Sequence, residues 1–169
     1  MAKADDLLIF PGTVVIDSRE QLPYAFRCIK GDFRTGHAPL LVNTVIAGLP
    51  SGDYSLVGLE GRIAVERKSL EDAFGTFGRG RRRFELELER LSAFDFAAVV
   101  VEATWEMILC DPPMSRKLTP KTIFRSVIAW QQRFTKVHWW MVGSRNLAER
   151  VTFRILERYY RDHVEKVVK

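Results

Sequence analysis

The stretch from Phe96 to Glu102, FAAVVVE, is apolar at every position except the last. A run of this length suits a β-strand, and an uninterrupted apolar strand is typical of a sheet covered on both faces. Sheets of that kind form where strands and helices alternate along the chain. This stretch therefore predicts an α/β fold with helices packed on both sides of a central sheet.

The rest of the sequence supplies the alternating elements. Five further segments are short and apolar, and predict strands at 13–16, 40–46, 54–57, 62–67 and 137–143. Helix signals, either an N-cap residue or apolar side chains at helical spacing, occur at Ser69, Phe84–Leu91, Thr119 and Ser144. Because 54–57 and 62–67 read as a hairpin, we expect a mixed sheet. The length of 169 residues favours one domain over the whole chain.

Three charged residues, Glu66, Arg67 and Lys68, close one of the apolar strands. Side chains alternate between the two faces of a strand, so Glu66 and Lys68 share one face and Arg67 points to the other. Antiparallel pairing in the predicted hairpin brings Asp53 toward the same end. The sequence therefore predicts two carboxylates and an amine at one edge of the sheet.

Two more acids, Asp17 and Glu20, follow the first predicted strand and join this group if that strand lies alongside. Grouped carboxylates repel one another unless a cation compensates, and Mg²⁺ prefers a few carboxylates while keeping several waters. A cation held by Asp53, Glu66 and one further acid could support phosphodiester hydrolysis. Lys68 could then orient or deprotonate the attacking water, or neutralise charge in the transition state. The alternative is a simple Glu66–Lys68 ion pair at a strand end, with Asp53 as a turn residue.

Four motifs occur in a fixed order: VVIDSREQ, GDYSL, IAVERKSLED and RRRFELELERL. They resemble the nuclease domain of the XPF family of structure-specific DNA endonucleases. The resemblance covers the core motifs at 13–102 and, more loosely, the helical part at 119–169. The residues that match the family motifs are Asp17, Arg19, Glu20, Gly52, Asp53, Tyr54, Glu66, Arg67, Lys68, Asp72, Arg83 and Phe84.

The resemblance implies a restriction-endonuclease-like core and DNA cleavage assisted by Mg²⁺ or Mn²⁺, with a preference for branched, flap or junction DNA. The catalytic residues that it implies are Asp17, Glu20, Asp53, Glu66, Arg67, Lys68 and Asp72, with Asp17, Asp53 and Glu66 as metal ligands. Asp72 is equally well explained as the partner of Ser69 in a helix cap. Arg67 points to the opposite face and is expected to pair with an acid of the first strand.

Two departures from the family pattern affect what can be carried over. Glu87 stands where many members have glutamine, so no role is assigned to that position. No helix-hairpin-helix module is evident in the sequence, which leaves two expectations open: a compact stand-alone nuclease, or one domain of a longer protein. The resemblance also implies a homodimer, or a heterodimer with a related nuclease subunit.

Basic residues are concentrated in one part of the chain. Between Pro112 and Ala148 there are seven lysines and arginines and no acidic residue, which suits a polyanion such as nucleic acid. The run GRGRRR at 78–83 reads as a loop that could clamp phosphates. The candidate DNA-binding residues are Arg79, Arg81, Arg82, Arg83, Lys121 and Arg125. The alternative is a solvated basic surface without a partner.

Composition excludes several classes of protein. No apolar run reaches membrane-spanning length, and the start of the chain lacks the pattern of a signal peptide. Cys28 and Cys110 have no metal-binding spacing and read as reduced thiols. We therefore expect an intracellular protein, cytoplasmic if prokaryotic or viral and nuclear if eukaryotic. Besides an endonuclease, a non-catalytic DNA-binding partner subunit and an α/β domain that binds protein or RNA remain open.

Overall fold

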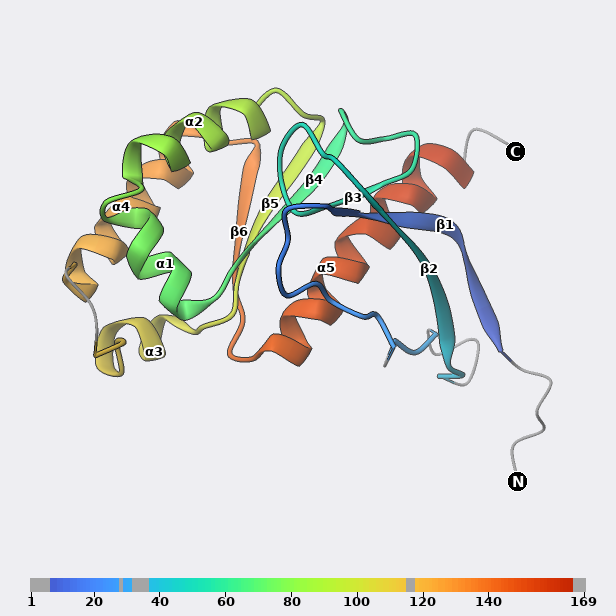
Figure 1. Ribbon diagram of the computed structural model, residues 1–169, viewed down its shortest axis with the longest axis horizontal. Helices are drawn as coiled ribbons and strands as arrows, with labels where there is room; N and C mark the ends of the chain where they lie inside the picture. The colour runs from blue at the N-terminus through green and yellow to red at the C-terminus, as the bar shows by residue number, and fades with distance from the viewer. Residues whose placement is uncertain (1–6, 28, 32–36, 115–117, 166–169) are drawn as a thin grey trace.

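A six-stranded mixed sheet forms the centre of the molecule in the computed structural model, which describes residues 7–27, 29–31, 37–114 and 118–165 (Figure 1). The prediction for Cys28 falls outside the described residues, as do Arg116 and Lys117, two of the seven basic residues counted between Pro112 and Ala148. The strands are β1 (Leu8–Asp17), β2 (Leu40–Ala47), β3 (Tyr54–Leu56), β4 (Ile63–Lys68), β5 (Phe96–Val101) and β6 (Val137–Met141). The mixed sheet and its flanking helices confirm the predicted α/β class.

The strand order across the sheet is β2-β1-β3-β4-β5-β6. β3 runs antiparallel to both β1 and β4, whereas β1 pairs parallel with β2, and β4, β5 and β6 are parallel to one another. The carboxyl end of β4 therefore lies beside the carboxyl end of β5 and beside the residue that precedes β3. This topology brings the predicted charged residues to one edge.

Five α-helices and one π-helical segment occur in the part of the chain that the structure describes. They are α1 (Leu70–Phe77), α2 (Arg81–Leu91), α3 (Trp105–Cys110), α4 (Pro120–Arg133), α5 (Arg145–Tyr160) and the π-helical segment η2 (Arg161–Glu165). The predicted caps are confirmed, because the hydroxyls of Ser69, Thr119 and Ser144 each accept a hydrogen bond from the backbone N–H three residues later.

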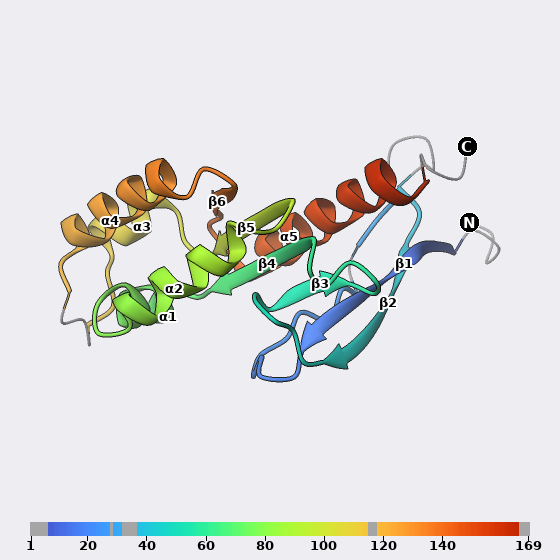
Figure 2. The same cartoon turned by 90° about the horizontal axis from the view of Figure 1, so that it is seen from above.

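The two faces of the sheet carry separate cores. Ile63 and Val65 of β4 point into a cluster with α5, which crosses β5, β4, β3 and β1. Ala64 points into a second cluster, formed with α1, α2 and α4. Figures 1 and 2 show α1 to α4 gathered at one end of the molecule, while β1 and β2 extend away at the other end. The alternating faces of β4 thus tie the charged strand end to both layers.

One local prediction was wrong in part, and one helix was missed. The GRGRRR run is not a loop throughout, since Arg81 to Arg83 form the first turn of α2. Helix α3 was not predicted, although Thr104 caps it and Ile108 is buried. None of the described helices is long and apolar enough to cross a membrane.

Candidate active site

Asp53 and Glu66 lie opposite each other at the end of the β3–β4 pair. Tyr54 pairs with Val65, and the backbone N–H of Asp53 donates to the carbonyl oxygen of Val65 at 2.9 Å. The carboxylate of Asp53 accepts a hydrogen bond from the backbone N–H of Arg67 at 2.7 Å. The predicted convergence of these two acids is therefore present.

The electrostatics of Asp53 reflect this crowding. Burial, followed by repulsion from Glu66, raises the pKa of Asp53 to about 8. The ammonium of Lys68 and the N–H of Arg67 oppose that rise without cancelling it. At neutral pH the site consequently holds less negative charge than its sequence suggests, unless a further cation joins it.

Glu66 and Lys68 form a hydrogen-bonded ion pair on the face that they share. Burial raises the pKa of Glu66, although Lys68 opposes that shift. Burial lowers the pKa of Lys68, but Glu66 and Asp53 outweigh it, so the pKa of the amine is raised overall. The Lys68 ammonium also lies 5.5 Å from the centroid of the Phe84 ring, which fixes its position from the side of α2.

A pocket of about 300 Å³ opens beside this pair. Its lining includes Glu66, Lys68, Asp72, Arg83, Phe84 and Glu87. One wall is the end of β4 and the others come from α1 and α2. The pocket therefore joins carboxylates, an ammonium and a guanidinium in one concave site.

Arg67 occupies the other face of the strand end, as predicted. Its guanidinium contacts Glu20 at 3.5 Å and, more closely, Glu102 at 2.7 Å. The pairing with an acid that follows the first strand is thus present, but Glu102 is the main partner. This network lies behind the strand and holds the ends of β4 and β5 together.

Asp17 is not brought into a metal-binding group with Asp53 and Glu66. Its backbone N–H bonds to the carbonyl of Asp53 at 2.8 Å, but its carboxylate pairs with Arg19 at 2.6 Å. Within the described residues, no three His, Cys, Asp or Glu side chains are grouped to hold a metal ion. The predicted trio is therefore reduced to the pair Asp53 and Glu66.

Asp72 combines the two roles that the sequence left open. Its backbone N–H donates to the hydroxyl oxygen of Ser69 at 3.1 Å, and that hydroxyl donates to the Asp72 carboxylate at 2.6 Å. The same side chain lines the pocket beside Lys68. Asp72 thus caps α1 and adds negative charge to the pocket rim.

The candidate DNA-binding residues separate into two groups. Arg81 donates to the Ser126 hydroxyl at 2.5 Å and stacks over Trp130 at 4.7 Å from the ring centroid, so it joins α2 to α4. The others are exposed or line the pocket rim, without an ion pair among the described residues: Arg79, Arg82, Arg83, Lys121 and Arg125. These five can contact a polyanion without breaking an internal pair.

Two acids of the site were missed in the sequence. Glu102 follows the buried strand FAAVVV, so the charge that closes this apolar run could have indicated it. Its carboxylate also accepts from the Tyr24 hydroxyl at 2.8 Å and from Arg145 at 3.3 Å. Glu87 was noticed only as a departure from a family pattern. In the structure its carboxylate lines the pocket and accepts a hydrogen bond from the N–H of Gly52 at 3.0 Å.

The remaining donors fit a divalent cation. Mg²⁺ commonly takes one or two protein carboxylates and retains several waters, and Asp53 and Glu66 provide such a pair. Burial and the neighbouring carboxylates raise the pKa values of both groups, and a bound cation would relieve that repulsion. Asp53 and Glu66 are therefore the residues that would hold an ion.

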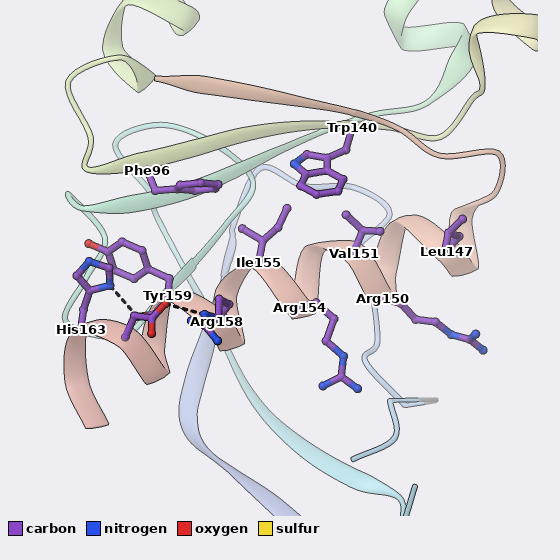
Figure 3. Close-up of a pocket in the computed structure, with 11 residues that line it drawn as sticks. Phe96, Trp140, Leu147, Arg150, Val151, Arg154, Ile155, Arg158, Tyr159 and His163 are labelled. Carbon is purple, nitrogen blue, oxygen red and sulfur yellow. Dashed lines mark hydrogen bonds and ion pairs between the residues drawn. The ribbon is translucent and has the colours of Figure 1, made fainter. Parts of the chain in front are cut away.

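A second pocket, of about 530 Å³, lies on the α5 side of the sheet, away from these carboxylates. Figure 3 shows Phe96 and Trp140 of the sheet facing Val151 and Ile155 of α5. Arginines of α5 line its outer rim. Its apolar walls do not suit hydrolytic chemistry.

The fold and the site define an α/β domain with an acidic and basic centre at the end of its central strands. The chain belongs to the ERCC4 domain family, which matches residues 16–155. This confirms the predicted relation to XPF nuclease domains. No curated protein matches the sequence.

The solved structures that are similar to the chain include the following two. XPF from Aeropyrum pernix matches with a TM-score of 0.59 and 19% identity, over 90% of this chain and 61% of that one. The same protein in complex with DNA matches with a TM-score of 0.56 and 18% identity, over 89% and 66%. The chain thus spans less than two thirds of either, and the likeness establishes the shared fold.

Proposed function

We propose that this protein is a DNA endonuclease that hydrolyses phosphodiester bonds with Mg²⁺ or Mn²⁺. The observation that carries the proposal is the convergence of Asp53, Glu66 and Lys68 at one strand end, where Glu66 and Lys68 line a pocket. Membership of the ERCC4 domain family supports it. The preference for branched, flap or junction DNA rests on that membership alone.

Each side chain has a role that its position supports. A cation bound by Asp53 and Glu66 would polarise the phosphate and lower the pKa of a bound water. Lys68 is held as an ammonium by its carboxylate neighbours, so it suits stabilisation of developing negative charge better than abstraction of a proton. Arg83, on the pocket rim, is placed to contact a phosphate next to the scissile one.

The exposed basic residues support the choice of substrate. Lys121 and Arg125 lie one turn apart on α4, and both are exposed. Ser126, the neighbour of Arg125, contacts Arg81 at the start of α2. The unpaired cations of the two helices can therefore contact the phosphate backbone of one DNA molecule. That DNA would run along α2 and α4 from the pocket.

Cleavage of branched DNA in the presence of Mg²⁺ tests this proposal. We expect nicking by the unchanged protein and loss of at least a hundredfold in rate for Asp53→Asn and for Lys68→Ala. Asp111→Asn, an exposed acid outside the pocket, is the matched control and retains the rate. Equal cleavage by all variants would indicate a contaminant. DNA binding without any cutting would instead support the non-catalytic partner subunit.

We also propose that a second copy of this chain covers the apolar pocket between the sheet and α5, with a related nuclease subunit as the alternative. Trp140 is 44% exposed and Leu147 is 46% exposed at this site, beside the open edge of β6. Light scattering tests this: Trp140→Glu with Leu147→Glu should yield monomers, whereas Leu109→Glu on α3 should not. From the proposed DNA substrate we further propose an intracellular location, which is the cytoplasm for a prokaryotic or viral protein and the nucleus for a eukaryotic one.

A further inference from the structure

Side chains of helix α2 hydrogen-bond to the turn that precedes Asp53. The carboxylate of Glu87 accepts a hydrogen bond from the backbone N–H of Gly52 at 3.0 Å. Arg90, one turn further along α2, donates to the hydroxyl of Ser51 at 3.1 Å and forms an ion pair with Glu87. Two adjacent residues immediately before Asp53 are therefore held by one helix face.

The turn is closely packed at Gly52. Gly52 has a φ of +78°, and a Cβ placed there would lie 2.9 Å from the Cβ of Ala64. Ser51 and Gly52 are buried, so their polar groups depend on protein partners rather than on water. Without Glu87, the N–H of Gly52 loses the partner that the structure gives it.

We propose that Glu87 is a positioning residue, which sets the orientation of Asp53 by holding the N–H of Gly52. The inference rests on the proposed endonuclease function and adds a residue to it. Glu87 acts through its hydrogen bond and not through its charge. A glutamine, whose side-chain oxygen can accept the same hydrogen bond, should therefore replace it.

The geometry explains why the effect reaches the chemistry. Asp53 follows Gly52 directly, and its carboxylate must face Glu66 while its backbone remains paired with Val65. A shift of the turn moves the carboxylate relative to Glu66 and to the phosphate. Misplacement by about 1 Å can reduce a rate by about a hundredfold.

Two variants separate the hydrogen bond from the charge. We expect Glu87→Ala to lower kcat at least tenfold with little change in KM for DNA, and Glu87→Gln to retain most of the activity. Glu89→Ala, on the same helix and paired only with Arg133, is the matched control. Equal losses in Glu87→Gln and Glu87→Ala would overturn the proposal, because they would assign the role to charge. Full activity in Glu87→Ala would overturn it as well.

Hydrogen exchange provides a readout that does not depend on cleavage or on the folding of the alanine variant. The amide of Gly52 should be protected in the unchanged protein and in Glu87→Gln. A rapidly exchanging Gly52 amide in either protein contradicts the proposal, whether or not the protein cuts DNA. If no preparation cleaves DNA while Gly52 is protected as expected, the proposed function fails and the positioning contact stands.

Discussion

The guanidinium of Arg67 donates to both carboxylate oxygens of Glu102, from Nε at 2.7 Å and from Nη2 at 3.0 Å. This two-point contact joins the last residues of β4 to the residue that follows β5. Arg67 lies between Glu66 and Lys68 in the sequence. Its two hydrogen bonds to Glu102 therefore fix the backbone from which those two side chains project. It lies on the opposite face and leaves the pocket open.

Removal of Glu102 should destabilise the fold. Glu102→Ala leaves Arg67, whose side chain is 7% exposed, with the longer contact to Glu20 as its remaining carboxylate partner among the described residues. A lost hydrogen bond to a charged group costs about 1.5 to 3 kcal/mol, and urea unfolding measures that loss. Arg62→Gln breaks the exposed pair with Asp95 and should leave the urea midpoint nearly unchanged, because water screens exposed ion pairs. Similar losses in both variants would contradict the structural role of Glu102.

Asp53 should make the metal-free protein less stable as the pH rises. Its folded-state pKa, raised to about 8 by burial and then by Glu66, lies above the ordinary 3.8. The folded state binds the extra proton, so this contribution is fully favourable below about pH 4 and is lost as the pH rises through 8. Thermal melts from pH 5 to 9 measure this effect, and the melting temperature of Asp53→Asn should decline less steeply with pH than that of the unchanged protein. Identical slopes would show that Asp53 does not titrate in this range.

Two glycines provide a matched test of the turn before Asp53. Gly52 and Gly58 have φ values of +78° and +79°, but only Gly52 lacks space for a Cβ. Each alanine variant should lose about 1 to 2 kcal/mol in free energy of unfolding, because alanine disfavours the left-handed backbone conformation. Gly52→Ala should lose more stability and abolish cleavage, while Gly58→Ala keeps its rate. Normal cleavage by Gly52→Ala would show that the turn tolerates displacement.

Removal of the unpaired cations should weaken DNA binding without affecting the chemistry. Alanine at Arg82, Lys121 or Arg125 should lower the affinity for DNA uniformly across sequences. Each substitution should also reduce the slope of log K against log salt concentration by about one. Fluorescence anisotropy titrations measure both effects. Arg81→Ala should instead lower stability, because Arg81 is engaged with Ser126 and Trp130. A salt slope unchanged in all three surface variants would remove them from the DNA path.

Much of the fold could be predicted because its signals are local. The apolar run before Glu102, the hydroxyl caps at Ser69 and Thr119, and the alternation along β4 each depend on neighbouring residues. Helix α3 was missed because it is short and only Ile108 is buried in it. The GRGRRR run was misassigned because glycine favours a loop locally, whereas packing of Arg81 on Trp130 stabilises the helix.

The site was predictable only in part. Alternation and hairpin pairing were enough to bring Asp53, Glu66 and Lys68 together. The direction of the Asp17 carboxylate was not predictable, because its neighbour Arg19 competes for it. The position of Glu87 depends on how α2 packs against a distant turn, which no local pattern encodes.

The two faces of β4 belong to different cores, one shared with α5 and the other with α1, α2 and α4. A chimera that exchanges either layer with that of a relative will also alter the support of the proposed active site. Grafting this site onto another scaffold therefore requires both layers as one unit, rather than the strand alone.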